Sequence, residues 1–584
     1  MSLTKVTYSM IDGVGVNAKD FGAVGDGVTS DTAAIQALFD AAISSGAKEI
    51  FFPSGTYLIS CNRTDLDYTC AIIIDGLKNC VVRGTKNTKF TKNTSGTGPA
   101  EYGFFRVQQC EDVTFTNFEM DSTGIAFSNN ANRSRGFLLA TIDVNNKAIN
   151  LLPNKNLEFS YIYAHDQVAF VSYALRDETI FPGPPAGEGL YIHDCRTYNI
   201  RSDHPIGIGY YKNVVIQNNR FINPLALSTD IDNMAVDMSA AVNTGLVQNN
   251  YVYGFPFGMK SESRSPSGYF GAENRSSQRI LFDNNYLEQI GNPAVILIPG
   301  PGGGDTFGIK LNSKGSAATN NTIIARDISI TTGGLGIGVA ALNSSNTEAT
   351  ALVDGNYIVS SVYGVLHTDA AGATRQFTTT IRNNRIVDSK LHGINAGANC
   401  TIENNRIYRT ISEAIQIQSP DQTYVRNNFA FNCASTNNPT IADTVVFSQV
   451  GTGAQGYLEF TGNIIEDTRG ASAAKYGYFF NAYGMPSANQ IVFTPGVTSG
   501  LFTAIAYDKY FSAVGTSLQL PGTLVPAART IVVTNNPSLA APWNTMPWNA
   551  GDTAVFSVPT VGLPKGYVCT VGGTPGTWVS QGNL

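Results

Sequence analysis

Acidic side chains gather in one part of a 584-residue chain that carries few charges. Only 14% of its residues are charged. The acids between about residues 160 and 310 include Asp166, Asp177, Glu188, Asp203, Asp230, Asp232, Asp237 and Glu262. Glycosidic hydrolysis needs one protonated acid at the leaving oxygen and one carboxylate that activates water or attacks the sugar. Two carboxylates held side by side would supply this pair, because their mutual repulsion raises the pKa of one of them.

A repeated Asn pair indicates how these acids are positioned. It occurs at Asn218-Asn219, Asn249-Asn250, Asn284-Asn285, Asn320-Asn321, Asn383-Asn384, Asn404-Asn405 and Asn427-Asn428, and with glycine first at Gly355-Asn356 and Gly462-Asn463. An apolar residue stands three positions before each second Asn, and another stands two positions after it. A strand, a tight Asn turn and a second strand, repeated every 21 (405−384) to 36 (321−285) residues, predict an all-β chain folded as a right-handed parallel β-helix. Asn tolerates the left-handed backbone region at such a corner, and its amide can hydrogen-bond to the next coil.

The Asn turns serve as a ruler for the acids. Asp230 and Asp232 lie 11 and 13 residues after Asn219, and Glu262 lies 12 after Asn250. Neighbouring coils stack about 4.8 Å apart, so the three carboxylates should be close. Side chains alternate between the two faces of a strand, so Asp230 and Asp232, at offsets 11 and 13, share a face that Glu262, at offset 12, does not. A bulge or a one-residue difference in turn length is required to bring Glu262 alongside them. We expect Glu262 and Asp232 to form the acid/base pair, with Asp230 in support.

A second chemistry makes different demands. β-Elimination from a uronate polymer needs a base for the sugar C5 proton and a cation that stabilises the enolate. The additional substrate-binding candidates are Asp203, His204, Tyr211, Asp237, Lys260 and Arg264. The long coils that carry these residues should form loops that wall a groove. The eight cysteines include no CxxC pair or zinc-finger spacing, so we expect buried free thiols, no metal and no cofactor. Cys61 and Cys70 are the exception, because they bracket a polar loop that a disulfide between them could close.

Charge and hydropathy exclude several classes of partner. The net charge is −6 and no long basic run occurs, which argues against nucleic acid or an anionic membrane surface. No stretch of about 18 apolar residues is present, and the first residues do not open a signal peptide. We therefore expect a soluble protein that does not insert into membranes.

Four segments are expected along the chain. Residues 1–16 form a lead, and 17–60 begin the β-helix with a cap: a helix over 33–44, started by Ser30 or Asp31 and ended by Gly46, that shields the apolar end of the solenoid. Residues 61–470 form the catalytic β-helix. Residues 471–584 form a C-terminal β module for trimerisation or glycan binding, because the Asn frame stops and all three tryptophans fall in the last 42 residues.

The segment DFGAVGDGVTSDTAAIQALFDAA, followed by IFFPSGTYLI, resembles the opening motif of the pectate-lyase-like β-helix superfamily. Within it, the lead Leu3 to Ile11 resembles bacteriophage tailspikes that depolymerise bacterial surface polysaccharide. The resemblance implies a homotrimer on the virion that binds other phage tail proteins and cleaves a capsule, O-antigen or exopolysaccharide outside the host cell. In one respect we expect a departure from the longest tailspikes, because residues 1–16 do not resemble an N-terminal particle-binding domain. Thr229-Asp230 is weakly similar to the Asn-Thr-Asp element of polygalacturonase-like hydrolases, whose Asp-Asp and Gly-His-Gly elements are missing.

Three alternatives to hydrolysis remain open. The first is a polysaccharide lyase, and the second is a receptor-binding spike without catalysis. The third is a structural β-helix whose acids keep it soluble.

Overall fold

The computed structural model describes most of the chain in separate stretches. These are residues 15–60, 70–92, 103–123, 135–140, 152–167, 169–174, 187–200, 204–224, 233–239, 241–262, 277–291, 306–326, 336–343, 350–369, 379–397, 399–418, 423–434, 444–449, 457–469, 476–487, 490–493, 503–511, 530–533, 548, 550–556, 560–573 and 576–583. The chain divides into two compact units, Met1–Leu352 and Val353–Leu584.

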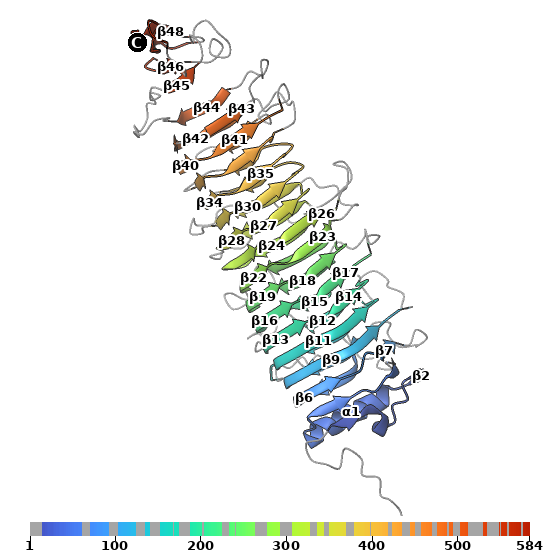
Figure 1. Ribbon diagram of the computed structural model, residues 1–584. Coiled ribbons are helices and arrows are strands. Elements are labelled where there is room, and N and C mark those ends of the chain that lie inside the picture. Colours follow the sequence, from blue (N-terminus) through green and yellow to red (C-terminus); the bar gives the residue numbers. More distant parts are fainter. Residues whose placement is uncertain are drawn as a thin grey trace, which may run out of the picture. The chain divides into compact units, whose positions relative to one another are not determined.

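The first unit is a stack of coils whose strands pair in parallel with the next coil, as Figure 1 shows. Each coil contributes to three sheets. The first sheet contains β5 (Cys70–Asp75), β8 (Gly103–Gln108), β10 (Arg135–Ala140), β12 (Ala169–Ala174), β15 (Ile206–Ile208), β18 (Met234–Ser239), β21 (Phe257–Glu262), β24 (Phe307–Asn312) and β27 (Ile337–Asn343). The second contains β1 (Val16–Asn17), β3 (Glu49–Phe51), β6 (Lys78–Arg83), β9 (Glu111–Asp121), β11 (Lys155–His165), β13 (Gly187–His193), β16 (Tyr211–Gln217), β19 (Asn243–Gln248), β22 (Gln278–Asp283) and β25 (Ser316–Thr319).

The third sheet follows the Asn turns. It contains β2 (Asp26–Ser30), β4 (Gly55–Ile59), β7 (Thr88–Lys92), β14 (Arg196–Tyr198), β17 (Arg220–Ile222), β20 (Tyr251–Tyr253), β23 (Tyr286–Ile290) and β26 (Thr322–Ala325). The long strands β9 and β11 run through both the second and the third sheet. This arrangement confirms the predicted parallel β-helix.

The Asn pairs occupy the predicted corners. The first residue of every pair has a positive φ, for example 56° at Asn249 and 51° at Asn284, and glycine replaces it at 355 and 462. The second residue is buried and forms a ladder between coils: the backbone N–H and Nδ2 of Asn250 both donate to Oδ1 of Asn285, at 3.1 and 3.0 Å. The predicted apolar neighbours line the interior. They are Ile216, Val247, Phe282, Ala318, Val353, Ile381, Ile402, Val425, Phe460, Phe221, Val252, Leu287, Ile323, Ile358, Ile386, Ile407, Ala430 and Ile465.

A helix closes the N-terminal end of the stack, as the sequence predicted. α1 (Thr32–Ser45) follows the 3-10 helix η2 (Ala18–Phe21) and ends at Gly46, whose φ is 66°. Its Phe39 packs against Phe52 and Phe105 of the coils, with ring centroids 6.3 and 6.2 Å apart. The side chain of Gln36 exchanges two 2.9 Å hydrogen bonds with the backbone of Ile73, so the helix also satisfies part of the exposed strand edge.

Asp31 stands at the predicted start of this helix but does not cap it through its side chain. Its carboxylate instead accepts hydrogen bonds from the backbone N–H groups of Val24 (2.6 Å), Gly25 and Leu58. The predicted capping role of the side chain is therefore wrong, because the preceding glycine-rich loop and strand β4 present these N–H groups to it.

The second unit has coils of the same construction. Its strands form three sets, each paired in parallel from coil to coil. The first set is β28 (Ala351–Asp354), β31 (Thr379–Arg382), β34 (Cys400–Glu403), β37 (Thr423–Arg426) and β40 (Tyr457–Thr461), and the second is β29 (Tyr357–Val359), β32 (Arg385–Val387), β35 (Arg406–Tyr408), β38 (Phe429–Phe431), β41 (Ile464–Asp467) and β43 (Gln490–Phe493). The third set is β30 (Tyr363–Asp369), β33 (Ile394–Ala396), β36 (Ile415–Gln418), β39 (Thr444–Gln449), β42 (Tyr476–Ser487) and β44 (Thr503–Phe511). Parallel pairing continues through β42 and β44, beyond the expected boundary at residue 470. The last pair of the Asn pattern is Gly462-Asn463, so these later coils pair without an Asn turn of that pattern.

A small separate sheet follows near the C-terminus, as predicted for a β module. β45 (Thr530–Val533) pairs in parallel with β46 (Thr553–Phe556), and β46, β47 (Gly566–Val571) and β48 (Thr577–Ser580) are antiparallel. Trp548 is buried there against Trp578, with ring centroids 4.6 Å apart.

Two further sequence expectations concern cysteines and membranes. The cysteines that the structure describes are free and buried, while Cys61 lies outside the described residues. Among the described residues, no helix combines the length and the hydropathy of a membrane span.

Candidate functional site

A cluster of charged side chains lies on the first sheet of the first unit. Asp237 is on β18, Lys260 and Glu262 are on β21, and Lys310 is on β24. In the strand register Asp237 is opposite Lys260, which is opposite Lys310. Residues two apart on a strand share a face, so Lys260 and Glu262 project on the same side of the sheet. The neighbouring positions Val236, Met259 and Ile309 are fully buried in the core, which places the charged row on the outer face.

The charged groups form one continuous network. His204 Nε2 lies 3.2 Å from Asp237 Oδ2, and Lys260 Nζ lies 3.5 Å from the same oxygen. Lys260 Nζ also contacts Glu262 Oε2 at 3.0 Å, and Lys310 Nζ contacts Glu262 Oε1 at 3.1 Å. The two carboxylates therefore share one ammonium group.

Electrostatics keep both carboxylates ionised. Burial opposes the charge on Asp237, which is 5% exposed, but Lys260 and His204 outweigh burial and hold the pKa of this carboxyl well below its usual range. Burial likewise opposes the charge on Glu262, and attraction to Lys260 and Lys310 lowers its pKa. A proton donor for this site must therefore be a different group.

The structure brings together part of the predicted site. Glu262, Asp237, His204 and Lys260 lie in one network. Four further candidates, Asp203, Asp230, Asp232 and Arg264, lie outside the described residues. The predicted pairing of Glu262 with Asp232 therefore stays a prediction.

The register differs from the spacing rule based on the Asn turns. Glu262 lies 12 residues after Asn250, yet it is opposite Ser239, which lies 20 residues after Asn219. Asp237, two residues before Ser239, shares the face of Ser239 and is diagonal to Glu262. Ser239 donates a short hydrogen bond to Asp237 and so supports that carboxylate.

The position of Tyr211 does not fit its predicted role in substrate binding. Its side chain is fully buried, and a Cβ atom on Gly187 would meet its ring at 2.5 Å. Burial raises the pKa of its hydroxyl well above the ordinary value. The ring fills space inside the coil stack and has no surface open to solvent.

Lys310 is the one member of the network that the sequence did not indicate. It follows Glu262 by 48 residues, and its alignment with Lys260 depends on the intervening loop lengths. The nearest signal was the alternation of Lys310 between Ile309 and Leu311, which is typical of a strand with one outward face.

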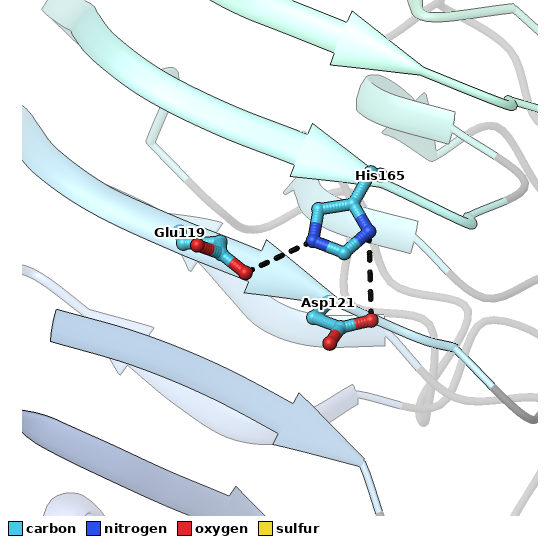
Figure 2. A group of neighbouring side chains, drawn as sticks. All are labelled: Glu119, Asp121 and His165. Carbon is cyan, nitrogen blue, oxygen red and sulfur yellow. Dashed lines mark hydrogen bonds and ion pairs between the residues drawn. The ribbon is translucent and has the colours of Figure 1, made fainter. Parts of the chain in front are cut away.

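A second charged cluster lies where β9 and β11 enter the third sheet. Figure 2 shows His165 between Glu119 and Asp121, with Nε2 3.0 Å from Glu119 Oε1 and Nδ1 3.5 Å from Asp121 Oδ1. These residue types are typical metal ligands, and one ligand atom from each lies within 4.8 Å of the others. Lys89 Nζ already contacts Glu119 at 2.9 Å and also pairs with Asp121. The lysine thus supplies a positive charge that both carboxylates share.

The same local pattern occurs twice in the sequence, as Tyr163-Ala-His165-Asp166 and Tyr191-Ile-His193-Asp194. In both, Nδ1 of the histidine contacts the next Asp, at 2.8 and 2.7 Å, and that Asp has a positive φ. Both histidines stack on the tyrosine two positions earlier. Because the pattern recurs at different strand ends, it is best explained as stabilisation of the corner.

Comparison with known families supports the architecture. A family profile described as "Rhamnogalacturonase A/epimerase, pectate lyase-like" matches residues 15–134. Over these residues the chain is similar to this pectate-lyase-like family. The matched residues include the cap helix and the first coils of this β-helix protein.

Individual relatives resemble this β-helix protein over different parts. Mannuronan C5-epimerase AlgE5 of Azotobacter vinelandii is 57% identical over 44 residues, which are 8% of this chain and 4% of the epimerase. Plasmin and fibronectin-binding protein A of Streptococcus pneumoniae is 23% identical over 296 residues, 48% of this chain and 35% of that protein. A mutant tailspike protein of E. coli bacteriophage HK620 in complex with a hexasaccharide aligns with 97% of this chain and 91% of its own, at 11% identity and a TM-score of 0.44.

Proposed function

We propose that this protein is a depolymerase that hydrolyses glycosidic bonds of a bacterial surface polysaccharide at the first sheet. The observation that carries the proposal is Glu262, an ionised and largely buried carboxylate beside a second carboxylate. Several relatives that are similar over short stretches are named mannuronan C5-epimerases, and mannuronan is a polysaccharide, which supports the substrate class.

The protonation states divide the catalytic roles. Glu262 is held ionised by two lysines, so it acts as the base that activates water or as the nucleophile. The acid at the leaving oxygen is then another group. Asp232 precedes β18 in the sequence and is the acid we propose; His204, which contacts Asp237, is the second candidate for this proton.

β-Elimination is the second candidate reaction. Lys260 and Lys310 place two ammonium groups side by side, where they would neutralise a uronate carboxylate and stabilise the enolate. His204 would then act as the base for the C5 proton. A uronate in the polymer is required for this reaction and not for hydrolysis.

One experiment distinguishes these reactions. Purified protein is incubated with capsules and O-antigens from a panel of hosts, and reducing ends and the ultraviolet absorbance of unsaturated uronates are followed together. Hydrolysis produces reducing ends without absorbance, and elimination produces both. We expect Glu262→Gln to lower kcat by about 10²–10⁴-fold, the typical contribution of a general base. Glu403→Gln, at a half-buried carboxylate on β34, is the matched control and should retain activity.

Retained cleavage in Glu262→Gln would show that this carboxylate is not catalytic. Tight binding without cleavage on every susceptible host would favour a receptor-binding spike. In either case the first-sheet network would be structural or binding rather than hydrolytic.

We also propose that the protein works as a homotrimer on a phage tail, outside the host cell and in contact with other tail proteins. The support is the resemblance of the lead and of the opening motif to tailspikes. Light scattering after size exclusion tests the oligomer: the mass should be three times the 62.3 kDa of one chain. A monomeric mass at micromolar concentration would contradict the trimer.

A further inference from the structure

The outer face of the third sheet carries a row of arginine and tyrosine side chains in the first unit. The strand register aligns Tyr163, Arg196, Arg220, Tyr251 and Tyr286 on successive coils. The two arginines and Tyr286 are exposed. This row lies on a different sheet from the network of Glu262 and the two lysines.

Arg196 and Arg220 stand directly opposite each other on neighbouring strands. Like charges in this position destabilise a sheet. Within the described part of the chain neither guanidinium has an ion-pair partner. Each is placed over a tyrosine ring instead: Arg196 lies 5.1 Å from the centroid of Tyr163, and Arg220 lies 4.7 Å from that of Tyr251.

Other surface arginines of the chain behave differently. Arg382 pairs with Asp354 at 2.8 Å, and Arg409 pairs with Asp388 at 2.6 Å. Arg426 likewise contacts a glutamate on the next coil. Cross-coil pairing with a carboxylate is therefore one way in which this chain accommodates an outward arginine, and the described residues offer no such partner to Arg196 or Arg220.

The same arrangement occurs independently in the second unit. Arg385 and Arg406 are opposite each other on β32 and β35, and both are exposed. Arg385 lies over two rings, 5.5 Å from the centroid of Tyr357 and 5.4 Å from that of Tyr408. The described residues again provide neither arginine with a carboxylate partner. Two occurrences in separate units make an incidental arrangement a poor explanation.

We propose that each arginine pair binds carboxylate groups of an acidic polysaccharide on its own face: the third sheet for Arg196 and Arg220, and strands β32 and β35 for Arg385 and Arg406. A guanidinium presents its donors in a planar fork that matches a carboxylate, and an anion between two guanidiniums would relieve their repulsion. Adjacent coils repeat at about 4.8 Å, so successive arginines can engage neighbouring groups along an extended polymer. The tyrosines hold the guanidinium planes in place and add apolar edges that sugar rings can contact.

The charge balance favours this occupant over a nucleic acid. The chain carries a net charge of −6, and each site has only two arginines. Strong binding to a nucleic acid backbone depends on many simultaneous phosphate contacts. A polymer with spaced carboxylates requires only a few local contacts, and two guanidiniums can provide them.

Binding to defined polymers tests the inference without requiring cleavage. The probes are polygalacturonate and polymannuronate, with neutral dextran of matched length as the uncharged comparison, measured by affinity electrophoresis on the full chain. The variants are Arg196→Gln with Arg220→Gln, and Arg385→Gln with Arg406→Gln. Arg279→Gln, an exposed arginine on the second sheet, is the matched control.

We expect the wild type to bind both acidic polymers and not dextran. Each double variant should weaken this binding at least tenfold and reduce its salt dependence, while Arg279→Gln stays within twofold of the wild type. All substituted arginines are exposed, so the thermal midpoints should be unchanged.

Four outcomes would overturn the inference. They are equal binding by the double variants, equal binding of dextran, equal binding of single-stranded DNA, and a change of oligomer mass in the double variants, which would assign the row to a subunit contact. Failure of the proposed hydrolysis can be distinguished from failure of this inference, because the polymer would then stay uncleaved while its binding is retained.

Discussion

Glu262 lies between two ammonium groups, and its neighbour Asp237 lies between a lysine and a histidine. Such a network costs desolvation energy for every ion, so its stability depends on each charge keeping its partner. Removal of one partner from a buried pair leaves an uncompensated charge. At the scale of single residues, the network is therefore sensitive to pH as well as to substitution.

The first prediction concerns acid stability. The pKa of Asp237 is lowered by folding, so it contributes stability that is present above its ordinary pKa near 4 and is lost as the pH falls through the folded value. Asp237→Asn should destabilise the protein by about 1–3 kcal/mol at pH 7, since Lys260 and His204 lose a charged acceptor. The difference from the wild type should shrink as the pH falls from 6 to 3. Thermal midpoints across this range provide the measurement.

Asp112→Asn is the control for that series. Asp112 is an exposed carboxylate on the second sheet, in a left-handed position that Asn also tolerates. Its curve should run parallel to that of the wild type. A constant difference between Asp237→Asn and the wild type at every pH would show that Asp237 is not the group responsible.

At the scale of elements, the Asn corners make a sharper prediction. Asn285→Ala removes the acceptor for the backbone N–H and Nδ2 of Asn250, and both groups are buried. Unmade buried hydrogen bonds cost about 1–3 kcal/mol each, so we expect a loss of about 2–4 kcal/mol. Asn284→Gly should change stability by less than about 1 kcal/mol, because the φ of 51° suits glycine. Urea unfolding of the two variants decides between them, and equal losses would contradict the ladder.

The aromatic core of the early coils carries a second prediction at this scale. Phe137 is fully buried, with ring centroids 4.7 Å from Phe159, 5.0 Å from Phe115 and 5.3 Å from Phe105. Phe137→Ala should therefore cost about 3–5 kcal/mol through lost contacts and a cavity. Val28→Ala, at a position that is 81% exposed, should cost less than about 0.5 kcal/mol. Differential scanning calorimetry compares the two, and a small effect of Phe137→Ala would mean that the core repacks around the gap.

The corners and the cap helix could be predicted from the sequence because local rules determine them. A positive φ at Asn249, a buried Asn250 and a left-handed Gly46 all follow from residue type and position. Site residues depend on loops of unequal length, and these do not follow local rules. Lys310 was missed for this reason, and equal offsets from the Asn turns did not predict that Glu262 is opposite Ser239.

At the scale of the whole molecule, strand pairings connect each coil to its neighbours, as the succession of β16, β19 and β22 illustrates. In such a solenoid, stability is approximately the sum of the coil energies and the nearest-neighbour interfaces. A local defect should therefore be felt locally. The Asn ladder allows a matched test, because Asn405 accepts in the second unit the same two hydrogen bonds that Asn285 accepts in the first.

We predict that Asn285→Ala speeds amide hydrogen exchange mainly in residues 243–290, and that Asn405→Ala does so mainly in residues 379–431. Each loss of buried hydrogen bonds lowers the opening free energy of its own coils by about 2–4 kcal/mol, which is about 30–800-fold in exchange rate for local opening. Mass spectrometry of peptides from both units measures the two patterns in one experiment. If Asn285→Ala accelerated exchange equally in residues 379–431, the coils would open as one cooperative body, and the additive description of the solenoid would be wrong.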